Sequence, residues 1–231
     1  MLIHRRFFLS MARLSMQAAL AAIAMSTAEA NPAEFLQASE PMQFRVNGLA
    51  LDVRSALVPM PRESLVQAIL AGWRDAGHQG LSFSPSEGRT VLGRQIGPLH
   101  ETLTLLSTDD PLRTAIVLAT QDLRQALGTA PPPPFGMPAG LRIIDTIEEI
   151  DGNEPTITYR MDSDLPTRES IERLRVSAVS AAWTVNSRTL SGKGPSMMEA
   201  SRGSQKLVAT ALVAPRGNPS RVVVQVIGRA P

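Results

Sequence analysis

The chain has 231 residues, which is room for one large domain or two small ones of about 100 residues each. It contains no cysteine, so disulfides, thiolate catalysis and cysteine-ligated metal centres are excluded. The formal net charge is +2, and residues 1–30, with three arginines and one glutamate, carry all of that excess. The rest of the chain has equal numbers of basic and acidic residues, and this balance does not favour nucleic acid as a partner.

Residues 1–30 have the organisation of an export signal. A basic start with Arg5 and Arg6 precedes an alanine-rich apolar run at 14–25, which is too short for a stable membrane span. Ala28 and Ala30 fit a small-x-small cleavage pattern. The predicted mature chain therefore starts at Asn31, has no transmembrane span, and is periplasmic or secreted.

The first residues also bear on the export route. Arg5 and Arg6 are followed by a variable residue and then Phe8 and Leu9. This pattern resembles the twin-arginine export motif of bacteria, and the resemblance implies that the protein folds before it is exported. An ordinary general-secretion signal that starts at Met11 is the alternative.

The segment that follows the signal has two parts. Residues 31–42 are polar and predict a flexible lead-in. Residues 43–53 alternate between apolar and polar side chains, which predicts a strand or a hairpin. Asn47-Gly48 is a typical hairpin turn.

A helix and three strands are predicted next. Leu65, Ile69 and Trp73 recur at helical spacing, and Pro61 suits the first position of that helix. Strand-like runs follow at 90–96, 101–107 and 113–120.

Four consecutive prolines at 131–134 mark the clearest boundary in the chain. Such a run favours a polyproline II spacer, so residues 128–140 are predicted as a linker. A docking site for a proline-reading groove is the functional alternative, and it is the less favoured one.

The second half follows a similar plan. Runs at 141–147 and 156–161 are strand-like, and the acidic stretch 148–154 between them is expected to be a solvated hairpin tip, because its spacing does not match a Ca²⁺ loop. Thr167 is a plausible N-cap of a helix. Strand-like runs at 184–190, 206–213 and 221–227 follow.

The two halves share a short motif, because Pro61-Arg62-Glu63-Ser64-Leu65 is echoed by Thr167-Arg168-Glu169-Ser170-Ile171. A tryptophan follows each, at Trp73 and Trp183. We therefore predict an α+β fold of two similar small domains, residues 43–127 and 141–231, each with one helix on a mostly antiparallel sheet in the order β-α-β-β-β. A chance match between two ordinary segments is the alternative.

No residue pattern predicts a reaction. His78 and His100 could each act as a base by residue type, or join Glu101, Asp109 or Asp110 at a metal, but exposed turn histidines are the simpler interpretation. A serine–lysine dyad on Lys193 or Lys206 rests on residue type alone. The loop 191–196 lacks the spacing of a phosphate-binding loop. No cofactor, no metal site and no enzyme activity are predicted.

Trp73 and Trp183 are the most distinctive remaining residues. They are expected to be core anchors of their helices, and contact with a partner or ligand is the alternative. The function expected by elimination is a non-catalytic periplasmic adaptor or assembly factor of a bacterial cell-envelope system, such as a secretion or pilus apparatus. Its partner would be an envelope protein, received at an open sheet edge. A periplasmic carrier of a small molecule or lipid is the rival hypothesis.

Overall fold

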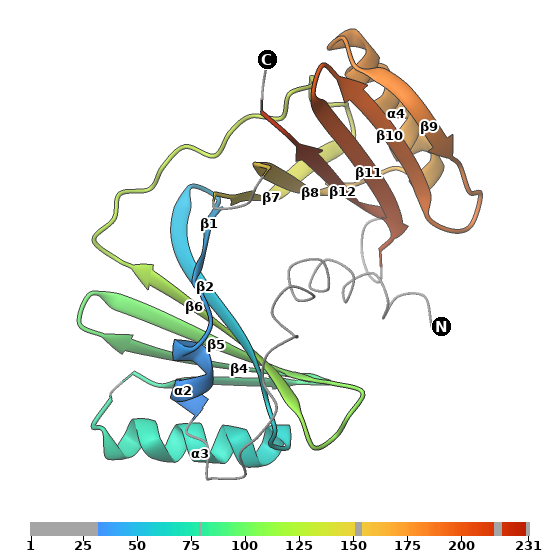
Figure 1. The fold of residues 1–231 in the computed structure, drawn as a ribbon. Coiled ribbons are helices and arrows are strands. Elements are labelled where there is room, and N and C mark those ends of the chain that lie inside the picture. The colour runs from blue at the N-terminus through green and yellow to red at the C-terminus, as the bar shows by residue number, and fades with distance from the viewer. Residues whose placement is uncertain (1–31, 79, 151–153, 215–218, 230–231) are drawn as a thin grey trace. The chain divides into compact units, whose positions relative to one another are not determined.

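The computed structural model describes residues 32–78, 80–150, 154–214 and 219–229 (Figure 1). It contains a mostly antiparallel sheet of twelve strands and few helices, so the predicted α+β class with a mostly antiparallel sheet is confirmed in that form. The predicted export-signal residues lie outside the described residues. They are Arg5, Arg6, Phe8, Leu9, Ala28 and Ala30.

Each helix that packs on the sheet is preceded by two strands and followed by four. The first set is α2 Pro32–Gln37, β1 Met42–Val46, β2 Leu49–Val58, α3 Arg62–Asp75, β3 Ser82–Ser86, β4 Arg89–Ile96, β5 Leu99–Ser107 and β6 Thr114–Asp122. The second set is β7 Leu141–Glu149, β8 Thr156–Ser163, α4 Thr167–Ser180, β9 Thr184–Thr189, β10 Ser196–Arg202, β11 Gln205–Val213 and β12 Ser220–Ile227.

The strand order is β3-β4-β5-β6-β2-β1-β7-β8-β12-β11-β10-β9. Outward from the β1–β7 pair, the order is β1-β2-β6-β5-β4-β3 on one side and β7-β8-β12-β11-β10-β9 on the other, so corresponding strands of the two sets occupy corresponding places. In each half, the strand before the packed helix lies between the first and the last strand of its set. The predicted order β-α-β-β-β was therefore incomplete.

One strand after each helix was not predicted from the sequence, namely β3 and β10. Strand β3 is exposed along its whole length and contains Pro85, so it has no apolar alternation to detect. Strand β10 does alternate, but its buried positions include only Met198 and Ala200 as apolar residues. Both signals are weak because strand prediction depends on strongly apolar, β-branched or aromatic residues.

The described residues divide into two compact units. Unit 1 consists of 32–40, 54–92 and 103–118, and unit 2 consists of 41–53, 93–102 and 119–229. The boundary falls within strands β2, β4, β5 and β6, and residues 128–140 belong to unit 2. The domain bounds proposed from the sequence stay a prediction.

Unit 1 is built around α3. Leu65, Val66, Ile69 and Leu70 of this helix are buried, which confirms the apolar stripe read from the sequence. Opposite them lie buried side chains of β4, β5 and β6, namely Leu92, Leu103, Leu105 and Ile116. Pro61 is the N-cap and not the first helical residue, and its carbonyl accepts the first helical hydrogen bond, from Leu65 N, at 3.0 Å.

The segment predicted as a flexible lead-in contains helix α2. Leu36 is 8% exposed and belongs to the core of unit 1. The Arg54 guanidinium donates to the backbone carbonyls of Leu36 and Ser39, at 3.3 and 3.0 Å. The prediction failed because one buried leucine and one distant arginine hold this short helix, and neither gives a periodic pattern.

The predicted hairpin at Asn47-Gly48 is confirmed by the pairing of β1 with β2. Asn47 and Gly48 have φ of 52° and 84°, as a two-residue hairpin turn requires. Gly48 also approaches Gly128, whose N–H donates to its carbonyl at 2.9 Å. A Cβ on Gly48 would lie 1.9 Å from the Gly128 oxygen, so only glycine fits.

Unit 2 is built around α4, which packs on strands β9 to β12. Ile171, Leu174 and Ala178 are at most 1% exposed and face buried residues of β10, β11 and β12 such as Met198, Ala209 and Val224. In β12 one face is buried and the other half-buried, so the strand is covered fully on one side only.

The helices show that the repeated motif is displaced by one residue. Both α3 and α4 have 14 residues, and their N-caps are Pro61 and Pro166. The motif instead pairs Pro61 with Thr167. Thr167 is the first helical residue, not the predicted N-cap, and its hydroxyl donates to the Gly194 carbonyl at 2.9 Å.

The proline segment, residues 128–140, lies between β6 and β7 and is packed into unit 2. Phe135 is 4% exposed and meets the Tyr159 ring edge-to-face at 6.3 Å. The carbonyls of Pro132 and Pro134 accept hydrogen bonds from Tyr159 Oη at 3.0 Å and Trp183 Nε1 at 3.1 Å. The segment therefore contributes to the core and is not a free spacer.

Strands β7 and β8 form the predicted hairpin. Its proposed solvated tip includes residues 151–153, which lie outside the described residues. Before the tip, Glu148 forms an ion pair with Arg45 of β1, at 3.4 Å.

Candidate functional site

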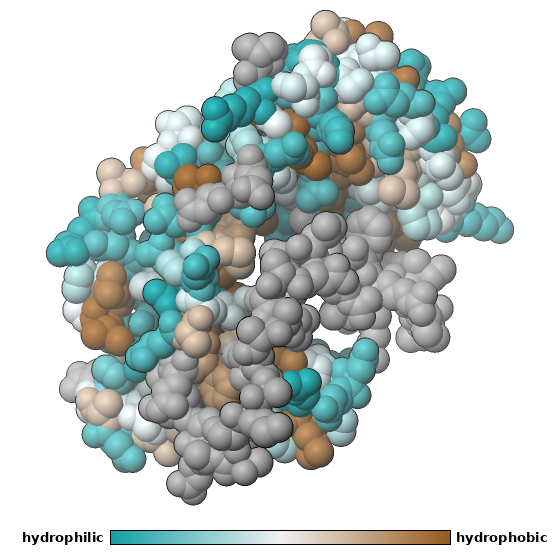
Figure 2. Space-filling view, viewed as in Figure 1, coloured by the Kyte–Doolittle hydropathy of each residue, from teal (hydrophilic) through white to brown (hydrophobic). Residues whose placement is uncertain are grey.

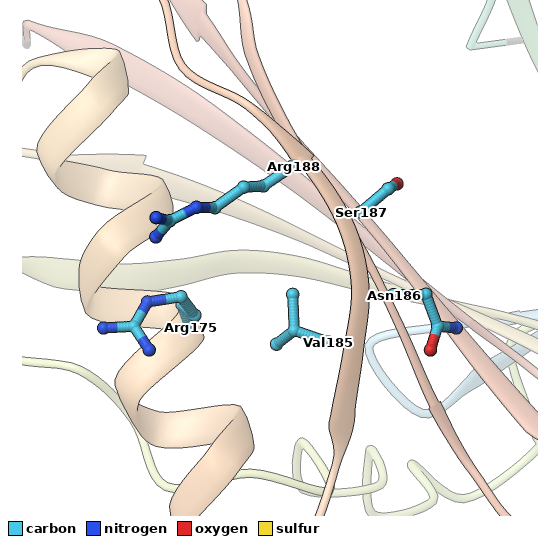
Figure 3. A pocket seen from close by; sticks show the side chains of 5 residues that line it. All are labelled: Arg175, Val185, Asn186, Ser187 and Arg188. Carbon is cyan, nitrogen blue, oxygen red and sulfur yellow. The ribbon is translucent and has the colours of Figure 1, made fainter.

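A shallow groove of about 430 Å³ lies between helix α4 and strand β9 (Figure 3). We call it the α4/β9 groove, and its lining residues are Arg175, Val185, Asn186, Ser187 and Arg188. In Figure 3 Val185 and Arg188 point from the strand toward the helix, whereas Asn186 and Ser187 point away from it.

A β-bulge explains why Val185 and Arg188 share one side of the strand. Ser187 pairs with Glu199 and Val185 pairs with Ala200, which leaves Asn186 as an extra residue in β9. In a regular strand, residues three apart point to opposite faces. The bulge shifts this alternation and brings the guanidinium of Arg188 to the helix side.

The groove carries an excess of positive charge. Glu172 Oε1 accepts from Arg188 at 2.6 Å, and Oε2 accepts from Arg175 at 2.8 Å. The hydrogen bond from Arg175 lowers the pKa of Glu172, and the charges of Arg188, Arg175 and Arg168 lower it further. Two guanidinium groups thus share one carboxylate.

Two exposed valines accompany these charges on α4. Val176 and Val179 are 54% and 51% exposed and follow Glu172 by one and two helical turns, so all three lie on one face of the helix. The surface of unit 2 visible in Figure 2 is mostly hydrophilic, with apolar side chains in small separate areas. The groove therefore combines positive charge with aliphatic surface.

Both outer strands of the sheet carry features that hinder the addition of another strand. β3 has five residues and contains Pro85, and β9 contains the bulge and Arg188. Prolines, bulges and charges are common protections of exposed edges. The two outer strands therefore offer little regular edge for pairing with another strand.

A second cleft, of about 330 Å³, lies in unit 2 beside His100. The other residues that line it are Val46, Asn47, Leu49, Leu51, Thr102, Ala119 and Gln121. Thr102 supplies a hydroxyl, but none of these residues has a carboxylate. Glu101 forms an ion pair with Arg94 at 2.6 Å. The cleft therefore lacks the carboxylate that would orient His100 as a base.

The other proposed catalytic and metal residues are not brought together. His78 follows α3 in unit 1, where its N–H donates to the Trp73 carbonyl. In the described parts of the chain, no group of three His, Asp or Glu side chains could hold a metal ion. Lys193 is exposed in the β9–β10 loop, where the Ser191 hydroxyl accepts from the Gly194 N–H at 2.8 Å.

A buried group of serines near the start of α4 has a structural role. Ser170 Oγ lies 2.8 Å from Ser163 Oγ and 2.9 Å from Ser220 Oγ. Ser163 Oγ accepts from Leu165 N, and Ser220 Oγ donates to the Leu165 carbonyl. All three serines are at most 1% exposed, and their hydroxyls satisfy one another and the backbone.

The two tryptophans do not occupy matching places. Trp73 lies within α3 and is half-buried against the core of unit 1. Trp183 lies after α4, is 2% exposed, and has the Arg202 guanidinium 4.7 Å from its ring centroid. With Pro61 and Pro166 as equivalent caps, the counterpart of Trp73 is Ala178. The proposal that both tryptophans contact a partner stays a prediction, and only Trp73 has exposed surface to offer.

The charged residues of the groove, Glu172, Arg175 and Arg188, were not predicted as a site from the sequence. Glu172 and Arg175 are three residues apart in α4, a spacing that indicates a helical ion pair. Arg188 lies in β9, so no helical spacing relates it to Glu172. The bulge at Asn186 and the packing of α4 on the sheet together bring Arg188 to Glu172.

Comparisons with known proteins do not identify a family. No family model matches the chain, and no curated protein matches it. One solved structure with some similarity is the bifunctional dehydratase-cyclase domain in ambruticin biosynthesis, with 14% identity over 83% of this chain and 96% of that one. Its TM-score is 0.15, which is too low to support an argument. No helix in the described ranges is long and apolar enough to cross a membrane.

Proposed function

We propose that the chain is a non-catalytic periplasmic adaptor or assembly factor of a bacterial cell-envelope system, such as a secretion or pilus apparatus, and that it holds a protein partner in the α4/β9 groove. The observation that carries this proposal is the groove itself, which Arg175 and Arg188 line, together with the exposed Val176 and Val179 on the helix face of Glu172. Arginine is enriched at protein interfaces, and exposed aliphatic side chains are stabilised when a partner removes them from water.

The rival carrier function requires a pocket between a helix and its sheet. In unit 2 that space is filled, because Ile171, Leu174 and Ala178 are at most 1% exposed and pack on the strands. This observation favours the adaptor over the carrier.

We also infer that the two sets of elements are copies of one unit. The matched strand order on either side of the β1–β7 pair and the equal length of α3 and α4 support this inference more strongly than the displaced sequence motif does. The periplasmic location rests on the sequence pattern of residues 1–30.

The test is capture of a partner from bacterial envelope fractions with the full chain. We expect one stoichiometric partner with the wild-type protein and loss of that partner when Val176 and Val179 are both changed to Glu. Val213→Glu is the matched control, because Val213 is also about half exposed, at 50%, and lies on β11 away from the groove lining. Equal recovery with all three proteins would overturn the proposal.

A further inference from the structure

We propose that the α4/β9 groove binds an acidic, extended segment of its partner, and that Glu172 is an internal competitor for the same arginines. This inference rests on the proposed adaptor function and adds the chemistry of the partner. It starts from the geometry of the groove, where the guanidinium groups of Arg175 and Arg188 share the single carboxylate of Glu172, at 2.8 and 2.6 Å.

The guanidinium groups keep unused donors. A guanidinium has five N–H donors, and in the described residues each of Arg175 and Arg188 makes one hydrogen bond, to Glu172. Their side chains are 35% and 47% exposed, so a ligand can reach them. A carboxylate from outside can therefore reach both groups, and Glu172, which already accepts one hydrogen bond from each, competes with it for their charge and donors.

The groove also limits the shape of its ligand. Its strand side consists of four consecutive residues, 185–188, which an extended peptide of about four to six residues would span at about 3.3 Å per residue. The bulge at Asn186 hinders regular pairing along β9. Recognition would therefore depend on carboxylate and aliphatic side chains, which meet the arginines and the valines Val176, Val179 and Val185.

Other polyanions fit this arrangement less well. Nucleic acids and anionic membranes are bound mainly by broad basic surfaces, whereas this patch is a short line of guanidinium groups beside apolar side chains. Arg173, which precedes Arg175 on the helix, is paired with Glu169 at 3.3 Å. An acidic peptide is the ligand that uses both the charge and the valines.

If Glu172 competes with the ligand, changes at Glu172 and at the arginines should shift the affinity for an acidic peptide in opposite directions. A purely structural ion pair would not produce this difference. Arg188→Gln and Arg175→Gln remove a binding group and should weaken the binding of an acidic peptide. Glu172→Gln removes the competing carboxylate, which frees both arginines, and should strengthen it. The two kinds of change therefore shift the affinity in opposite directions.

The experiment measures binding of a fluorescent peptide with three Glu-Val-Ser repeats to the full chain at low ionic strength, by anisotropy. We expect Arg188→Gln and Arg175→Gln to weaken binding about fivefold each, Glu172→Gln to tighten it about threefold to fivefold, and Arg173→Gln to leave it unchanged. A matched peptide with Lys-Val-Ser repeats should not bind. Thermal unfolding of each variant confirms that the fold is retained.

Several outcomes would overturn the proposal. Equal binding of the acidic and basic peptides would do so, as would unchanged affinity in Arg188→Gln. Tighter binding to vesicles with anionic lipid, with the same dependence on Arg188, would replace the peptide by a lipid surface. A partner that is lost with the Val176 and Val179 variants, together with no peptide binding, would reject this inference and leave the adaptor function standing. Peptide binding without any captured partner would reject the adaptor function.

Discussion

Units 1 and 2 hold their helices in place by different chemistry, although the elements follow the same order. Counted from the proline N-caps, Leu65 of α3 and Ser170 of α4 occupy the same helical position, and both are fully buried. Leu65 belongs to an apolar cluster. Ser170 lies in a network of hydroxyl groups with Ser163 and Ser220.

The same contrast extends through both cores. Of the buried polar residues in the described parts of the chain, Thr90 and Thr114 lie in unit 1, and the other nine lie in unit 2. Unit 2 also buries Tyr159 and Trp183, whose polar atoms reach the carbonyls of the proline segment. One arrangement of elements thus accepts buried hydroxyl groups beside its apolar core, provided that every buried polar group has a partner.

The largest loss of stability is expected when the serine that unit 2 has at this helical position is introduced into unit 1. Leu65→Ser leaves a cavity and buries a hydroxyl without the partners that Ser170 has, so unit 1 should lose about 4 kcal/mol or more of unfolding free energy. Hydrogen–deuterium exchange should show faster exchange in α3 than in α4. Leu112→Ser is the control, because Leu112 is 67% exposed, and it should cost at most about 0.5 kcal/mol. Equal loss of protection in both helices would show that the units unfold together.

An intermediate loss of stability is expected in unit 2 at high pH, through the ionisation of Tyr159. Burial raises the pKa of Tyr159 from 10.0 to about 12, and the charge of Glu148 adds to the shift. The folded state therefore favours the neutral phenol, so this stabilisation is complete below pH 10 and is lost as the pH rises from 10 to 12. Tyr159 is the only tyrosine of the chain, so its absorbance reports the titration directly.

The control for that measurement is Tyr159→Phe. This variant should be less stable at neutral pH, because the Pro132 carbonyl loses its donor, but its stability should not fall between pH 10 and pH 12 through this residue. A tyrosine that titrates near pH 10 in the folded protein would contradict the buried position.

The contrast between the units also explains which parts of the fold could be predicted from the sequence. The stripe of Leu65 and Ile69 and the Asn47-Gly48 turn are local signals, and the structure confirms both. The serines of unit 2 gave no signal, because serine is frequent and its burial depends on strands that are distant in the sequence. The sequence also does not show that Trp73 lies within α3 whereas Trp183 lies after α4, at different distances from the N-caps Pro61 and Pro166.

The groove was beyond prediction from spacing alone. The Glu172–Arg175 pair is visible in the helix, but Arg188 reaches Glu172 only because Asn186 forms a bulge in β9. Nothing in the residues 184–189 marks that bulge. The pairing with β10 and the packing of α4 create it, and both depend on the whole of unit 2.

The smallest effect is expected in the serine network itself. Ser170→Ala removes one hydroxyl, but Ser163 keeps the Leu165 N–H and Ser220 keeps the Leu165 carbonyl, so among the described residues the Ser163 O–H alone loses its acceptor. The expected loss is about 1 kcal/mol, far less than for Leu65→Ser at the equivalent position. Urea unfolding of this variant is compared with Ser180→Ala, an exposed serine at the end of α4, which should be close to neutral. A loss of about 3 kcal/mol or more would mean that the three hydroxyls stabilise one another cooperatively, and the double variant with Ser220→Ala would then cost less than the sum of the single changes.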